Sequence, residues 1–221
     1  MPSLYKLLLS SFLLFVDTMY AQRTLGLIYN TDESYDGYTL FSPISSKETY
    51  LIDNCGFVVN KWISNHLPGQ TAFLLENGDL LRTARIPGYF TGGGIGGKIE
   101  IFSWDGNIKW SKTFATEKYH QHHVAYPLPN GNILTILWYK YSKEEAIEKG
   151  FDPKKLTDQG VWSDKILEFK PLLNNDAEIV WEWDFWDHII QQFDSTKNNF
   201  GAIKDHPELL DANFFEDPGA N

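Results

Sequence analysis

Histidine side chains are concentrated in one short segment of the chain. Residues 119–123 read YHQHH and hold three of the six histidines. An imidazole can act as a nucleophile, as a proton carrier, as a hydrogen-bond donor to an anion or as a metal ligand. This segment is therefore the candidate site, and the alternative, a polar turn exposed to solvent, stays open at this point.

A metal centre is not predicted at these histidines. Successive side chains of a strand point to opposite faces, so His122 and His123 are expected on opposite faces of a regular strand and the segment does not gather all three histidines. No cluster of acidic residues lies nearby in the sequence to complete a ligand shell. Cys55 is the only cysteine, which excludes both a metal–thiolate site and an internal disulfide. We expect neither a metal nor a cofactor.

A glycine-rich segment raises the question of a nucleotide phosphate. Residues 91–106 read TGGGIGGKIEIFSWDG and match the spacings of two phosphate-binding motifs. These motifs are G-x-x-x-x-G-K and G-x-G-x-x-G, and both need a helix after the glycines. The motif G-x-x-x-x-G-K also needs Ser or Thr after its lysine, where this chain has Ile99. The residues that follow alternate like a strand and end in the turn signal Asp105–Gly106. We therefore expect a flexible connection that enters a strand.

Composition limits the partners and the location. The formal net charge is -10 without a basic block, which argues against nucleic acid and against anionic membranes. Lys6 followed by the apolar run 7–16 predicts a secretory signal peptide over residues 1–21, too short to span a bilayer. The remaining chain, 22–221, is expected to be exported to the periplasm or the cell exterior, without membrane insertion after cleavage.

The elements that would position the histidines are predicted to be strands. Five strand–turn–strand units with little helix between them indicate an all-β fold, and aromatic residues, which favour strands, make up 15% of the chain. The predicted hairpins are 49–63, 71–84, 98–114, 123–139 and 163–185. A helical insertion is expected at 142–160, with a capping box from Ser142 to Glu145. Short helices are also expected at 186–193 and 207–210.

The hairpins alternate in kind, which favours a β-propeller. One kind carries a tryptophan in its second strand and the other has an Asn–Gly turn, so two hairpins together form a blade of the length typical of propellers. We expect blades at 49–85 and 98–141 and half a blade at 163–185. About two and a half blades do not close a ring. Either an oligomer completes it, or the chain is the front of a longer protein, which we favour.

Four segments, in order, resemble the bacterial aryl-sulfate sulfotransferases. The run 122–132, HHVAYPLPNGN, is similar to the family's H-H-D-x-x-x-L-P-N-G-N element, and 162–171, WSDKILEFKP, is similar to its W-x-D-x-[IL]-x-E-x-x-P element. The runs 181–188 and 206–211 continue the resemblance, which covers roughly residues 36–213. Val124 departs from the family pattern, which often has Asp there and could fix the tautomer of His123.

The resemblance implies an exported six-bladed propeller that moves a sulfuryl group from a phenolic sulfate ester to a phenol through a sulfohistidine. It places His123, with its neighbour His122, among the substrate-binding residues. His188 also lies in a matching motif, but we expect a structural role for it. It implies no catalytic residue in this chain, because the family's nucleophilic histidine is expected beyond Asn221, so this chain alone is expected to be inactive. The alternatives are a non-catalytic exported propeller that binds a protein or glycan, and a quinoprotein-like propeller.

Overall fold

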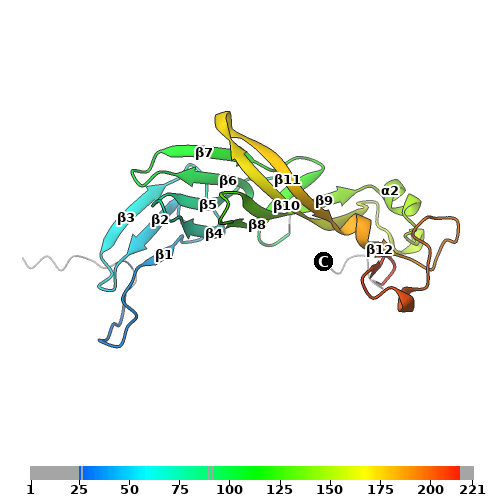
Figure 1. Ribbon diagram of the computed structural model, residues 1–221, viewed down its shortest axis with the longest axis horizontal. Helices are drawn as coiled ribbons and strands as arrows, with labels where there is room; N and C mark the ends of the chain where they lie inside the picture. The colour runs from blue at the N-terminus through cyan, green and yellow to red at the C-terminus, as the bar shows by residue number, and fades with distance from the viewer. Residues whose placement is uncertain (1–24, 26, 89, 91, 215–221) are drawn as a thin grey trace, which may run out of the picture.

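The computed structural model describes residues 25, 27–88, 90 and 92–214 and is built mostly of strands. Three antiparallel sheets lie in succession along the long axis, and a smaller part with short helices follows them (Figure 1). The predicted signal peptide lies outside the described residues. Within the described part of the chain, no helix is both long enough and apolar enough to cross a membrane.

Each sheet is a meander in which a strand pairs with its neighbours in sequence. Sheet A has three strands: β1 (Thr39–Phe41), β2 (Glu48–Ile52) and β3 (Val58–Ile63). Sheet B has four: β4 (Pro68–Leu74), β5 (Leu80–Arg85), β6 (Gly97–Phe102) and β7 (Ile108–Thr113). Sheet C has four: β8 (Tyr119–Pro127), β9 (Ile133–Tyr141), β10 (Val161–Leu172) and β11 (Asp176–Asp184).

The five predicted hairpins are confirmed, but their grouping into sheets is wrong. We expected the hairpins 49–63 and 71–84 to share one sheet, whereas β5 pairs with β6 from Leu80↔Phe102 to Arg85↔Gly97. The sheets therefore span 39–63, 68–113 and 119–184. Turn residues fix the register inside a hairpin. They carry no information on which hairpins pair with each other, and here the glycine-rich connection after β5 brings β6 beside it.

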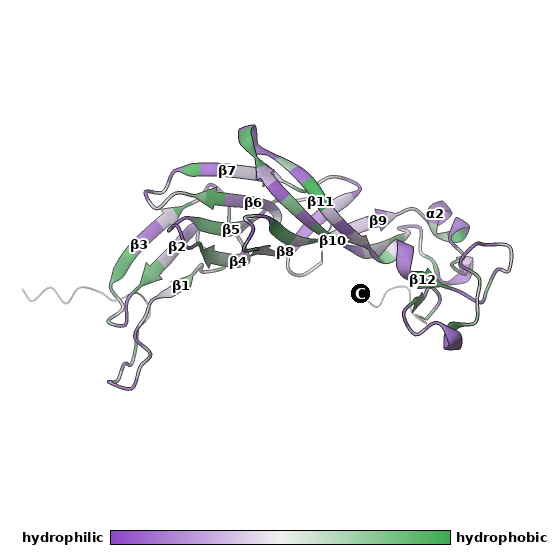
Figure 2. Cartoon of the chain, in the orientation of Figure 1, coloured by the Kyte–Doolittle hydropathy of each residue, from purple (hydrophilic) through white to green (hydrophobic). Residues whose placement is uncertain are grey.

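The core lies between successive sheets. Leu51 and Trp62 of sheet A are buried against Leu80 and Phe102 of sheet B. A larger cluster joins sheets B and C, with the members Leu81, Ile99, Trp110, Phe114, Ala125, Ile133, Leu137, Leu167 and Phe169. Figure 2 shows hydrophobic residues gathered on the strands of the sheets, while hydrophilic residues dominate the last part of the chain. Burial of these faces holds the stack together.

The insertion after β9 folds as expected. Helix α2 (Lys143–Glu148) begins with a complete capping box between Ser142 and Glu145, and Asp152 caps the 3-10 turn η2 (Pro153–Lys155). The two other predicted helices are wrong. Only Phe185–His188 (η4) is helical in the first, and it is followed by β12 (Ile189–Ile190). The second contains β13 (Leu210–Asp211), which pairs with β12 in parallel, while the 3-10 turn η5 lies earlier, at Ile203–Asp205.

Candidate functional site

The two predicted site residues, His122 and His123, lie together in a β-bulge. The pairing of β8 with β9 shifts register between Gln121 and Ala125, so the intervening residues are not paired in the ladder. The two rings are 4.2 Å apart at an interplanar angle of 65°, and their Nδ1 atoms share a hydrogen bond. Our expectation of opposite faces is therefore wrong, because it assumed a regular strand. Bulges re-aim side chains in this way.

Hydroxyl groups of neighbouring strands hold the bulge in place. Thr71 on β4 donates from Oγ1 to the carbonyl oxygen of His123 at 2.6 Å, and Thr83 on β5 donates to the same oxygen at 3.0 Å. Thr135 on β9 donates to the carbonyl of Val124 at 2.6 Å. These bonds satisfy backbone acceptors that the interrupted ladder leaves unpaired. The position of the two imidazoles is therefore fixed by sheets B and C together.

The glycine-rich connection lies against the histidine strand. Its chain enters β6 directly, so no helix follows the glycines and the phosphate-binding motifs are not formed. A Cβ on Gly96 would lie 2.2 Å from the carbonyl oxygen of His122, and one on Gly97, whose φ is +101°, would lie 2.7 Å from Nε2 of His120. The glycines are needed because backbone and histidines approach so closely. Gly94 lies beside both rings of the pair, at 3.5 Å from its would-be Cβ.

Aromatic side chains form one wall of the site. The ring of His122 meets Trp138 of β9 edge to face, with 4.2 Å between centroids. Phe90 of the connection is buried behind them and contacts Trp162 of β10 at 4.1 Å and Trp138 at 6.0 Å. His122 and Trp138 are only half-buried, so both remain accessible from solvent. A planar apolar group could stack there while a polar substituent reached the imidazoles.

Burial favours the neutral form of His122. The pKa of His122 is lowered by burial first and by the neighbouring His123 second, and Asp164 opposes this only in part. A neutral imidazole offers one N–H donor and one acceptor nitrogen, whereas an imidazolium offers donors alone. A neutral His122, whose Nδ1 bonds to His123, can therefore hold an anionic oxygen or accept a proton at Nε2, according to which nitrogen carries the hydrogen.

His120, two residues earlier, is completely buried and plays a different part. Neither ring nitrogen has a hydrogen-bond partner of good geometry among the described residues, and burial lowers the pKa of the ring. Gly88 and Gly97 close around the ring, and Phe90 contacts it at 5.8 Å. The ring of His120 therefore packs against the glycine-rich connection and does not face solvent.

The remaining histidines lie elsewhere. His66 approaches Glu100 at 3.3 Å, within a buried group that includes Arg82. His188 bonds through Nδ1 to the carbonyl of Asp184 at 2.9 Å and lies on Trp183. His206 pairs with Glu208 near the surface. Across the described ranges, no three His, Cys, Asp or Glu side chains are grouped so as to hold a metal ion.

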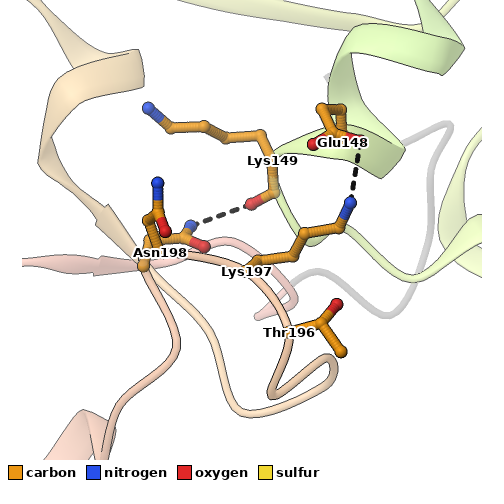
Figure 3. Close-up of a pocket in the computed structure, with 6 residues that line it drawn as sticks. Glu148, Lys149, Thr196, Lys197 and Asn198 are labelled. Atoms are coloured by element: carbon orange, nitrogen blue, oxygen red, sulfur yellow. Dashed lines mark hydrogen bonds and ion pairs between the residues drawn. The ribbon is translucent and has the colours of Figure 1, made fainter.

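A separate polar pocket of about 290 Å³ lies beside α2 (Figure 3). It is lined by Glu148, Lys149, Thr196, Lys197, Asn198 and Asn199. Lys197 pairs with Glu148 at 2.8 Å, and Asn199 donates to the carbonyl of Lys149 at 2.8 Å. These bonds join α2 to the loop after β12, far along the chain from the histidine pair.

Sequence reasoning found the histidine pair but missed the residues around it. The contributions of Phe90, Trp138 and Gly94 were not predicted, although the glycine run signalled a close approach of two backbones. In comparisons with known proteins, no protein-family model matched the chain, and no curated protein matched it.

Proposed function

We propose that the chain forms part of an exported β-propeller that binds a phenolic sulfate ester and transfers its sulfuryl group to a phenol. The propeller is supported by successive meander sheets whose first strands, β4 and β8, lie side by side and join through the bond from Thr71 to His123. In such a fold the first strand of each blade faces the central channel, so the bulge of β8 would face it too.

The single observation that carries the proposal is the pairing of His122 and His123 at that bulge. A sulfuryl group in transfer carries negative charge on its oxygens and is stabilised by fixed N–H donors. The two imidazoles, whose bulge is held by the hydroxyls of three strands, can provide such a donor without an added cation. The half-buried face of Trp138 next to them suits the aromatic ring of the ester.

The step itself assigns limited roles to these residues. The S–O bond to the donor phenol breaks, the leaving phenolate takes the electron pair, and a new S–O bond forms to the acceptor. The bond between the two Nδ1 atoms leaves a neutral pair one free N–H and one free acceptor nitrogen. The N–H would hold a sulfuryl oxygen, and the acceptor nitrogen would take the proton that the acceptor phenol loses. We assign no nucleophile among the described residues.

Binding of 4-nitrophenyl sulfate to the chain is the direct test. We expect calorimetry to detect binding, and His123→Ala to weaken it by about tenfold, as for the loss of one hydrogen bond to a charged group. His206→Ala, at a surface histidine away from the site, is the matched control and should bind normally. Release of 4-nitrophenolate by the complete propeller, with phenol as acceptor, tests transfer, because the chain alone is expected to be inactive. No binding, or binding that both variants leave unchanged, would refute the proposal.

A non-catalytic binding module is the second candidate. One observation favours it: neither ring of the pair makes a hydrogen bond with a carboxylate within the described residues, and Asp164 acts on His122 only through space. A carboxylate normally orients a catalytic histidine. Ester binding without phenolate release by the complete propeller, at any acceptor concentration, would select this candidate.

A further inference from the structure

One buried side chain organises the loop that forms a wall of the polar pocket beside α2. The side chain of Gln191 is completely buried. Its Oε1 accepts the backbone N–H groups of Phe193 and Asp194 at 2.6 and 2.7 Å, and its Nε2 donates to the carbonyl of Asp194 at 2.9 Å. A buried amide whose donors and acceptor are all used in this way holds the loop in one conformation.

The same loop is joined to the end of α2. Asn199 accepts from Nε2 of Gln191 at 3.3 Å and donates from its own Nδ2 to the carbonyl of Lys149 at 2.8 Å. A Cβ on Gly150, whose φ is +88°, would lie 2.7 Å from the side chain of Gln191, so the loop and the helix end approach as closely as a glycine permits. The walls of the pocket are therefore formed before a ligand binds, which reduces the entropy lost on binding.

The charges that line the pocket do not cancel. The lining contains two lysines and one glutamate, and Lys197 pairs with Glu148 at 2.8 Å. Among the described residues, no carboxylate lies within ion-pair distance of Lys149, whose Nζ lies 5.8 Å from the centre of the Trp186 ring. An aromatic ring attracts an ammonium group without neutralising its charge. One positive charge is therefore left over here, in a chain whose formal net charge is -10.

Asn198 supplies a second free polar group near Lys149. Figure 3 shows the ends of both side chains on the left of the pocket, away from the Lys197–Glu148 pair on the right. The side-chain amide of Asn198 is exposed and makes no hydrogen bond within the part of the chain that the structure describes. An ammonium group and an amide N–H that face one space are two donors, and a carboxylate offers two acceptor oxygens to match them.

The rest of the pocket suits hydroxyl groups. Its volume of about 290 Å³ is near the lower end of small-molecule sites, at about 300 Å³, and exceeds what a carboxylate alone would fill. Thr196 donates from Oγ1 to Asp194 at 2.6 Å, so this oxygen can still accept a hydrogen bond, as can Oε1 of Glu148. The six lining residues include no aromatic or aliphatic side chain, so an apolar ligand would gain little there.

We propose that this pocket binds a small hydroxylated carboxylate, of the sugar-acid class, with the carboxylate group between Lys149 and Asn198. A singly charged group matches the one unpaired lysine, whereas a doubly charged phosphate would leave a negative charge uncompensated near Glu148. The hydroxyl groups of the ligand donate to Thr196 and Glu148 and accept from Lys197. The site is separate from the histidine pair and does not depend on the function proposed for that pair.

Calorimetric titration of the chain with D-glucuronate tests this. We expect saturable binding that Lys149→Gln weakens by about tenfold or more, as for the loss of a hydrogen bond to a charged group. Asn198→Asp keeps the shape of the side chain but places a negative charge beside the carboxylate, so it should weaken binding at least as much. Lys143→Gln is the matched control on the same helix, because its ammonium group pairs with Asp158 at 3.0 Å outside the pocket lining, and it should bind normally. Circular dichroism confirms that each variant is folded.

Two related probes show which part of the ligand is recognised. D-Glucose has the hydroxyl groups without the charge and acetate has the charge without the hydroxyl groups, so each should bind about tenfold more weakly than D-glucuronate, or worse. Changes in the backbone amide NMR signals on addition of D-glucuronate should be confined to α2 and residues 194–199. The proposal is overturned if D-glucuronate shows no saturable binding, if Lys149→Gln binds it equally well, if either probe matches it, or if the signal changes centre on the histidine pair.

Discussion

The bulges of β4 and β8 occupy the same place in neighbouring sheets but carry different side chains. The ladder shifts between Pro68 and Ala72 in sheet B and between Gln121 and Ala125 in sheet C. Each bulge therefore frees three residues, GQT at 69–71 and HHV at 122–124. The shared ladder fixes the scaffold, whereas the unpaired positions accept residues of any chemistry. The candidate site therefore lies on a bulge that the first strands of sheets B and C share.

The two bulges also contact each other, and they differ in backbone. Thr71, in the bulge of β4, donates to the carbonyl of His123 in the bulge of β8. Gln70 has a φ of 81°, in the left-handed region, while its counterpart His123 lies outside that region. The bulge without histidines thus supports the one with them and takes the less favourable conformation.

The support of the β8 bulge by the glycine-rich connection should be the easiest feature to break. In Gly96→Ala, the new Cβ would lie 2.1 Å from Oε1 of Gln121 and 2.2 Å from the His122 carbonyl. We expect the free energy of unfolding to fall by about 3 kcal/mol or more, as for a severe steric clash. Chemical denaturation measures it. Gly93→Ala is the matched control, because nothing lies within 4 Å of its Cβ, and equal losses in both variants would contradict the packing described.

Gln121, where β4 has Pro68, should be the next most sensitive position. Its buried side chain accepts from the N–H of Gly97 at 2.8 Å and donates to the carbonyl of Val124 at 3.0 Å. Gln121→Leu removes the acceptor of the Gly97 N–H, whereas the Val124 carbonyl keeps its bond from Thr135, so we expect a loss of about 2 kcal/mol in urea denaturation. Thr71→Val should cost less, because Thr83 still donates to the His123 carbonyl. A larger loss in Thr71→Val would reverse this ranking.

The pH dependence of stability distinguishes His120 of β8 from its counterpart Leu67, which precedes β4. Burial lowers its pKa, so the unfolded chain binds a proton more readily than the folded one. The stability is therefore complete above the ordinary histidine pKa of about 6.5 and falls as the pH drops below it. His120→Leu gives β8 the residue that precedes β4, Leu67, and removes a buried ring whose nitrogens have no hydrogen bond of good geometry among the described residues. We expect about 1 kcal/mol of added stability at neutral pH and a weaker acid dependence. Thermal melts at several pH values measure both, and an unchanged acid dependence would contradict this explanation.

Gln70 should give the smallest effect. Glycine adopts a positive φ without a steric cost, so Gln70→Gly should raise stability by at most about 1 kcal/mol. His123→Gly, at the counterpart position, should only lower it. Differential scanning calorimetry of both variants decides the matter, and the same sign of change in both would mean that the two backbones do not differ as described.

The sequence predicted the strands well because their information is local. Alternating apolar residues and Asn–Gly or Asp–Gly turns specify hairpins such as β8 with β9, and all five formed. The pairing of β5 with β6 depends on the connection 86–96, whose glycines carry no periodic signal. The helix expected at 186–193 failed because Ile189 and Ile190 find a strand partner in β13, a tertiary contact that propensity does not encode.

The candidate site was only half visible in the sequence for a similar reason. The presence of two adjacent histidines, His122 and His123, identified the segment. The contact between their rings depends on a bulge that interrupts the alternation of side chains along the strand. The wall formed by Trp138 and Phe90 brings together residues from β9 and from the glycine-rich connection. Such assembly follows from the three-dimensional path of the chain and has no signature in local spacing.

The meander topology has a consequence for the order in which the chain can fold. Every strand of sheets A, B and C pairs only with strands adjacent in sequence, and short loops close the strand pairs except β5 with β6 and β9 with β10, which the connections 86–96 and 142–160 join. Chains with such local contacts fold quickly, because little loop entropy is lost before contacts form. Each sheet can form once its last strand is free and then serve as a template for the next. Coupling passes only between neighbouring sheets, so a weakened sheet B would let sheets A and C unfold independently.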